Sequence, residues 1–244
     1  MDYSNTLRWP SHCPPVALWP VSLTLWRFKL ERFSIYAISF GGPTVIAYAA
    51  RHPEKVRRLV FYGTYARFIR DAQERRRWEA MVTLMRTGWG SDNPAYRQMF
   101  TSLFMPDGSE VDQRVLNEMG RVAASPENAA AFMTATLDID VRKLARQIIA
   151  PTLVVHVRGD QVVPFDSGRE LAALIPGARM AVIEGRDHIP VPGDGEQEQL
   201  VQAVFPFLDE DTQKAATTGS STRFIARARN GKGRAYRSFV STTR

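Results

Sequence analysis

The sequence predicts an α/β fold built on a parallel sheet. Four short apolar runs have the continuous hydrophobic character of strands buried on both faces: Phe33–Ile38, Leu59–Tyr62, Pro151–Val157 and Ala178–Ile183. Stretches with helical character separate these runs, and strands that alternate with helices form a parallel sheet with right-handed crossovers. Hydrophobic residues make up 44% of the 244 residues and charged residues 23%, so the chain has enough apolar material for a sizeable core.

Residues 1–30 do not follow this pattern. They contain three tryptophans and four prolines, and prolines at this density interrupt helices and central strands. We therefore expect an irregular N-terminal segment ahead of a core that covers residues 31–208.

Helices of the core are expected after the first, third and fourth strands, at residues 44–52, Phe165–Ile175 and Glu196–Leu208. A turn over Glu54–Arg58 joins the first helix to the second strand. Asp166 or Ser167 is expected to cap the second helix, because short polar side chains accept hydrogen bonds from free N–H groups at helix starts.

A long helical insertion, at about residues 68–147, separates the second and third strands. Three of its stretches look helical: Asp71–Arg86, Val111–Ala124 and Pro126–Thr136, the last with Ser125 as its cap. Six of the eight methionines fall in the insertion, and methionine adapts to irregular apolar space. The insertion is interpreted as a lid over an apolar pocket, with plain helical core as an equally good alternative.

The positive charge is concentrated at the C-terminal end. Residues 212–244 contain eight basic and no acidic residues, which leaves the remainder of a chain of net charge +7 at −1. The end is rich in Ser, Thr, Gly and Arg and poor in large apolar residues, so we expect residues 209–244 to be a disordered basic tail. Such a tail can contact nucleic acid weakly and without specificity, although a solvated extension without a partner is the interpretation we favour.

Several protein classes are excluded by composition. The single cysteine, Cys13, rules out an internal disulfide framework and a zinc site built from several cysteines. No apolar run is long enough for a transmembrane helix, and the N-terminus lacks the pattern of a secretory signal. These features predict a cytoplasmic protein, and they leave its oligomeric state open.

Ser39 is the candidate nucleophile. It lies between the first strand and the following helix, in Ala37-Ile38-Ser39-Phe40-Gly41. This sequence approximates the G-x-S-x-G pattern of a nucleophile elbow, in which the serine occupies a strained strand-to-helix turn. Such a turn is expected to need small residues two positions before and two after the serine, and Ala37 and Gly41 meet this requirement although Ala37 departs from the strict glycine.

A nucleophilic serine needs a base and an acid that orients the base. His188 follows the last strand, and Asp160 follows the third strand, so both emerge at the carboxyl edge of the sheet, where such folds place their sites. The chain order Ser39, Asp160, His188 is that of one class of serine hydrolases. Asp166 and Asp187 are alternative acids, but Asp166 is better explained as a helix cap, and Asp187 adjoins His188 too closely for easy triad geometry.

The other three histidines have simpler explanations. His156 lies inside an apolar strand, and we expect a core histidine with satisfied hydrogen bonds. His52 precedes a proline at a helix end, and His12 belongs to the irregular N-terminal segment.

Together these motifs resemble the α/β-hydrolase family. The match runs from about Glu31 to Leu208 and rests on AISFGG, ARHPEKVRRLVFYG, RGDQVVP and EGRDH. The resemblance implies hydrolysis of small carboxylic esters or lactones through an acyl-enzyme, without metal or organic cofactor. It also implies the site residues: Ser39 as nucleophile, His188 as base, Asp160 as its orienting acid and the Phe40 backbone N–H as one half of the oxyanion hole.

The sequence departs from the family upstream of the elbow. The family normally has several strands there, and one leads to a loop, often His-Gly, that supplies the second oxyanion donor. This sequence contains no His-Gly. We therefore expect a sheet that is incomplete on its N-terminal side, a truncated or frame-shifted hydrolase with unrelated residues at both ends. Loss of one oxyanion donor costs about 10²–10³ in rate, so impaired catalysis, or a non-catalytic ligand-binding module, is the alternative function.

Overall fold

The computed structural model describes residues 31–191, 193, 195–217, 225–229 and 235–239. Contacts divide the chain into two compact units, residues 1–203 and residues 204–244. The irregular segment expected over residues 1–30 lies outside the described residues. Within the part of the chain that is described, no helix is long and apolar enough to cross a bilayer.

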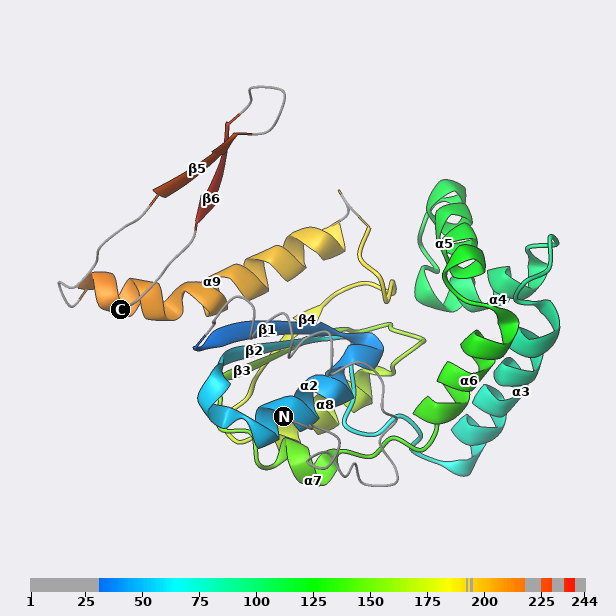
Figure 1. The fold of residues 1–244 in the computed structure, drawn as a ribbon, viewed down its shortest axis with the longest axis horizontal. Coiled ribbons are helices and arrows are strands. Elements are labelled where there is room, and N and C mark those ends of the chain that lie inside the picture. Colours follow the sequence, from blue (N-terminus) through cyan, green and yellow to red (C-terminus); the bar gives the residue numbers. More distant parts are fainter. Residues whose placement is uncertain (1–30, 192, 194, 218–224, 230–234, 240–244) are drawn as a thin grey trace, which may run out of the picture. The chain divides into compact units, whose positions relative to one another are not determined.

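A four-stranded parallel sheet forms the centre of the first unit (Figure 1). Its strands lie in their sequence order: β1 Phe33–Ile38, β2 Val56–Tyr62, β3 Thr152–Val157 and β4 Arg179–Ile183. The sheet confirms the predicted α/β fold. One boundary differs, because β2 begins inside the turn expected over residues 54–58: the fully buried Val56 pairs with Phe33 of β1.

Helices α2, Gly42–Arg51, and α8, Phe165–Leu174, lie on one face of the sheet (Figure 1). The short helix α7, Arg142–Ala145, contacts both of them. The predicted side-chain cap of α8 is wrong: the residue at the N-cap is Pro164, which makes no side-chain cap hydrogen bond. Asp166 and Ser167 do not cap because the helix begins at Phe165, which places both residues inside its first turn.

Besides α7, the insertion contains four helices that are grouped beside the sheet (Figure 1): α3 Ala72–Gly88, α4 Ala95–Phe104, α5 Glu110–Ala123 and α6 Pro126–Thr136. Three were predicted with nearly these ends, and Ser125 caps α6 as expected by accepting from the Asn128 N–H at 3.2 Å. Helix α4 was missed, because its N-cap residue is Pro94, which has no polar side chain to mark the start of a helix.

Five of the six methionines of the insertion fall into two groups, and the sixth, Met81, is partly buried. Met85, Met105 and Met133 are buried with the tryptophans of the insertion, whereas Met99 and Met119 are exposed. The buried ones therefore belong to the packed core, and methionine content alone does not mark a pocket.

The C-terminal elements differ from the sequence prediction. Helix α9, Gly195–Thr217, continues beyond the predicted end at Leu208, because residues 209–217 include Glu, Gln, Lys and Ala, which are good helix formers. Strands β5, Ile225–Arg229, and β6, Ala235–Phe239, pair antiparallel where no regular element was expected.

Candidate active site

Ser39 has a strained backbone. Its φ of 51° is the only positive φ at a non-glycine residue in the described part of the chain, and this left-handed conformation costs an ordinary residue about 1–2 kcal/mol. The serine stands where β1 ends at Ile38 and a short 3-10 turn leads into α2. This is the geometry of a nucleophile elbow, in which the turn presents the serine hydroxyl at the edge of the sheet.

The glycine that this turn requires is Gly42. A Cβ built on Gly42 would lie 1.9 Å from Oγ1 of Thr64, whereas a Cβ on Gly41 would meet nothing within 4 Å. The expectation that Gly41 must be small is therefore wrong. Thr64 comes this close because its hydroxyl donates a 2.5 Å hydrogen bond to the Ser39 carbonyl oxygen, which supports the strained residue.

The structure brings the three candidate triad residues into one hydrogen-bonded chain. Nε2 of His188 lies 2.7 Å from Oγ of Ser39, and Nδ1 of His188 lies 2.6 Å from Oδ2 of Asp160. A carboxylate only accepts, so Nδ1 carries a hydrogen and Nε2 is free to accept from the serine hydroxyl. The residues come from the end of β1, the loop after β3 and the loop after β4, which meet because the strands are parallel.

Asp160 is buried and fixed by backbone donors. Its Oδ1 accepts from the N–H groups of Val162 and Val163, both at 2.9 Å, while Oδ2 faces His188. The carboxylate therefore has one oxygen tied to its own loop and one tied to the base. Gly63, at the end of β2, lets the imidazole approach the sheet, because a Cβ there would lie 3.0 Å from Cε1 of His188.

The helical insertion holds the loop of the candidate base. The backbone N–H groups of His188 and Ile189 both donate to the carbonyl oxygen of Phe104 at the end of α4, at 2.8 and 3.2 Å. The Phe104 ring meets the His188 ring edge-on at 5.3 Å. No sequence signal pointed to this contact, because it joins segments 84 residues apart that share no motif.

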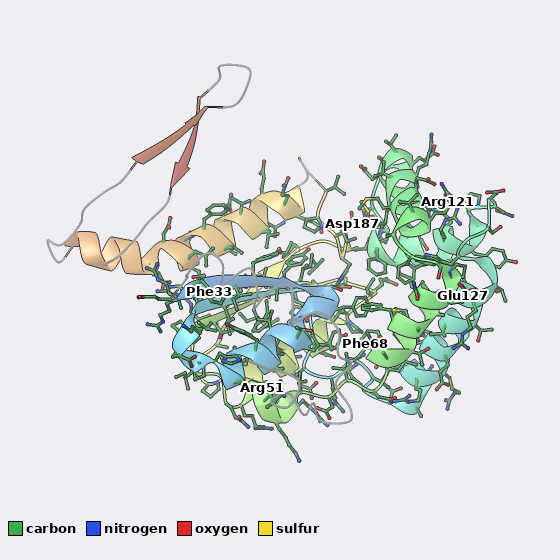
Figure 2. The ribbon with its side chains drawn as sticks, in the orientation of Figure 1. Phe33, Arg51, Phe68, Arg121, Glu127 and Asp187 are labelled. Carbon is green, nitrogen blue, oxygen red and sulfur yellow. The ribbon has the colours of Figure 1, made fainter. Side chains whose placement is uncertain are left out.

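The two alternative acids serve other purposes. Asp187 is buried in the loop that faces the insertion (Figure 2), and its Oδ1 accepts from the Asp107 N–H at 2.8 Å. Arg186 pairs with the Asp107 carboxylate, and this hydrogen-bonded guanidinium lowers the pKa of Asp107 below its ordinary value. Asp166 pairs with Arg169 at the surface, at 3.3 Å.

Aromatic rings surround the residue that follows the serine. The Phe40 ring lies 5.5 Å from the ring of Phe68, 5.3 Å from that of Phe132 and 6.2 Å from that of Tyr65. Phe132 belongs to α6 of the insertion and is 41% exposed.

The backbone N–H of Phe40 is the oxyanion donor predicted from the sequence. The loop that supplies a second donor in the family was expected to be missing from this sequence, and residues 1–30 lie outside the described residues.

A family model for the alpha/beta hydrolase fold matches residues 25–192. Pimeloyl-[acyl-carrier protein] methyl ester esterase of Neisseria meningitidis serogroup A is 29% identical over 157 residues, which cover 62% of this chain and 50% of that protein. Pyrrolizixenacetamide deacetylase of Xenorhabdus hominickii is 31% identical over 157 residues, with coverage of 62% and 57%. The chain thus spans about half the length of these relatives.

Solved structures share the fold. An alpha/beta hydrolase from a deep-sea metagenome library, MGS-M2, has a TM-score of 0.67 at 17% identity and covers 82% of this chain and 73% of its own. The enol-lactonase of Burkholderia xenovorans LB400 has a TM-score of 0.60 at 24% identity, with coverage of 78% and 70%.

Proposed function

Because this chain belongs to the alpha/beta hydrolase family, we propose that it is a serine hydrolase that cleaves small carboxylic esters or lactones through an acyl-enzyme on Ser39. The observation that carries the proposal is the hydrogen-bonded chain from Ser39 through His188 to Asp160, at a serine with a strained backbone. An esterase and an enol-lactonase among the similar proteins support the choice of ester and lactone substrates.

The geometry supports a two-step mechanism. Oγ of Ser39 attacks the carbonyl carbon while its proton passes to Nε2 of His188, 2.7 Å away. Asp160 stabilises the resulting imidazolium, and the Phe40 N–H donates to the oxyanion. The tetrahedral intermediate collapses, and the C–O bond breaks as His188 returns the proton to the leaving alcohol. A water then repeats the sequence on the acyl-serine, which releases the acid and regenerates the hydroxyl.

The aromatic surroundings favour an uncharged, apolar acyl group. Phe40 directly follows the nucleophile and its ring contacts that of Phe132, and such rings gain by contact with apolar rather than charged groups. Nitrophenyl butyrate and hexanoate should therefore be turned over faster than a nitrophenyl ester whose acyl chain ends in a carboxylate.

Turnover of a short-chain nitrophenyl ester tests the proposal, together with labelling by a fluorophosphonate probe. Wild type should hydrolyse the ester and be labelled at Ser39. Ser39→Ala should lose both, with a fall in kcat of at least about 10³. Ser102→Ala is the matched control, because Ser102 is an exposed serine on α4 whose hydroxyl donates a hydrogen bond to the Met99 carbonyl oxygen of the same helix. Equal turnover by wild type and Ser39→Ala would refute the assignment.

The second candidate is a non-catalytic ligand-binding module. It is favoured by one fact: the chain spans about half the length of its curated relatives. Folded wild-type protein that resists the fluorophosphonate would support this candidate, whereas labelling of Ser39 would exclude it.

A further inference from the structure

A second histidine lies behind the acid of the candidate triad. His156 in β3 is fully buried, and its Nε2 lies 2.8 Å from the carbonyl oxygen of Val163 and 3.6 Å from Oδ2 of Asp160. A carbonyl oxygen only accepts, so Nε2 carries the hydrogen. Nδ1 is buried without a hydrogen-bond partner. The expectation of a fully satisfied core histidine is therefore met at one nitrogen only.

The surroundings keep this ring neutral. A proton on Nδ1 would create a buried cation with no acceptor for that hydrogen, and burial is the main reason that the pKa of His156 is lowered. Asp160 and His188 are the titratable groups that act on the ring, and their effects on its pKa have opposite signs. On α8, the Phe165 ring meets the His156 ring edge-on at 6.0 Å and Gly168 lies beside Nδ1, and neither residue titrates.

His156 is linked to Asp160 by two successive hydrogen bonds that share Val163. Val163 receives the His156 hydrogen on its carbonyl oxygen, and its own N–H donates to Oδ1 of Asp160 at 2.9 Å. Val163 is thus held on both sides of its Cα. A loop that shifted at Val163 would release Oδ1 and change the angle at which Oδ2 meets His188.

We propose that His156 is a positioning residue for the triad: its neutral ring anchors Val163 and so fixes the Asp160 carboxylate against His188. The inference rests on the proposed function of Ser39, His188 and Asp160. The packing of α8 supports it, because a Cβ on Gly168 would lie 2.3 Å from Nδ1 of His156, so only glycine leaves room for the ring in this position.

The proposal is tested by comparing two variants, His156→Leu and His156→Gln. Leucine fills the space without a donor, whereas the glutamine amide can still donate to Val163. We expect His156→Leu to lower kcat for a nitrophenyl ester roughly 10- to 100-fold with little change in KM, because small misplacements of catalytic groups have effects of this size. His156→Gln should recover most of the rate. Val154→Ala, a buried change two residues earlier in β3, controls for general destabilisation.

A spectroscopic readout does not depend on turnover. The proton that Nδ1 of His188 shares with Asp160 across 2.6 Å should give a far-downfield proton resonance. This resonance should broaden or disappear in His156→Leu and persist in His156→Gln and Val154→Ala. A wild-type rate and an unchanged resonance in His156→Leu would overturn the inference.

The two readouts separate the inference from the proposed function. An inert wild type whose resonance depends on His156 would refute the hydrolase and keep the positioning role. An active wild type whose rate and resonance are unchanged in His156→Leu would support the hydrolase and overturn the positioning role. If His156→Leu does not fold, His156→Asn takes its place, because asparagine is too short to reach Val163. Behaviour of His156→Asn like wild type in both readouts would also overturn the inference.

Discussion

Gly63→Ala should damage catalysis beyond its effect on stability. Gly63 has a φ of +53°, and an added Cβ would lie 3.0 Å from Cε1 and 3.2 Å from Nδ1 of His188. Alanine in this backbone conformation costs about 1–2 kcal/mol in the free energy of unfolding. The imidazole must also move by a few tenths of an ångström, although it is held by bonds of 2.6 and 2.7 Å to Asp160 and Ser39. We expect kcat to fall about 10- to 100-fold.

Gly177→Ala separates the two effects. Gly177 has a comparable φ of +70°, but a Cβ there would meet nothing within 4 Å. Both variants should lose similar stability in urea denaturation, and only Gly63→Ala should lose kcat in the nitrophenyl ester assay. Wild-type kcat in Gly63→Ala, or an equal loss in Gly177→Ala, would show that contact with the imidazole does not matter.

Three further outcomes are expected. Asp187→Ala should lower kcat several-fold with little change in KM, because the Asp107 N–H loses its acceptor and the His188 loop loses a hydrogen bond to the insertion. Asp187→Asn keeps an acceptor and should stay near wild type. Equal kinetics for the two variants would show that this hydrogen bond does not matter for kcat. The free energy of unfolding should fall as pH drops below about 6.5, because His156 takes up a proton more readily in the unfolded chain than in the folded one. This fall should be smaller in His156→Leu. Urea titrations of both proteins from pH 7.5 to pH 5 measure the fall, and parallel pH dependences would contradict the prediction. Removal of residues 212–244, which carry eight basic residues, should leave ester turnover unchanged, and any salt-sensitive RNA retention on a filter by the full chain should be lost. Loss of turnover in a folded truncation would show that this segment is needed for catalysis.

The parts of the site that could be predicted are those encoded locally. Ser39 was identifiable because a strand, a turn and a helix follow one another within a few residues. Asp160 and His188 were identifiable because each directly follows an apolar strand, and parallel strands end at one edge. Three contacts depend instead on how distant segments meet: Phe104 with the His188 loop, Thr64 with Gly42, and His156 with Val163. Local patterns carry no information about such contacts.

These hidden contacts explain how a strained and buried site remains ordered. The cost of the left-handed backbone at Ser39 is offset by the hydrogen bond from Thr64 to its carbonyl oxygen. The imidazole of His188 is fixed through its ring by Asp160, and its backbone is fixed separately by Phe104 of the insertion. Movement of α4 would therefore displace the candidate base without touching the nucleophile. It follows that changes in the insertion that displace the end of α4 should act on kcat through His188, even when they lie far from Ser39.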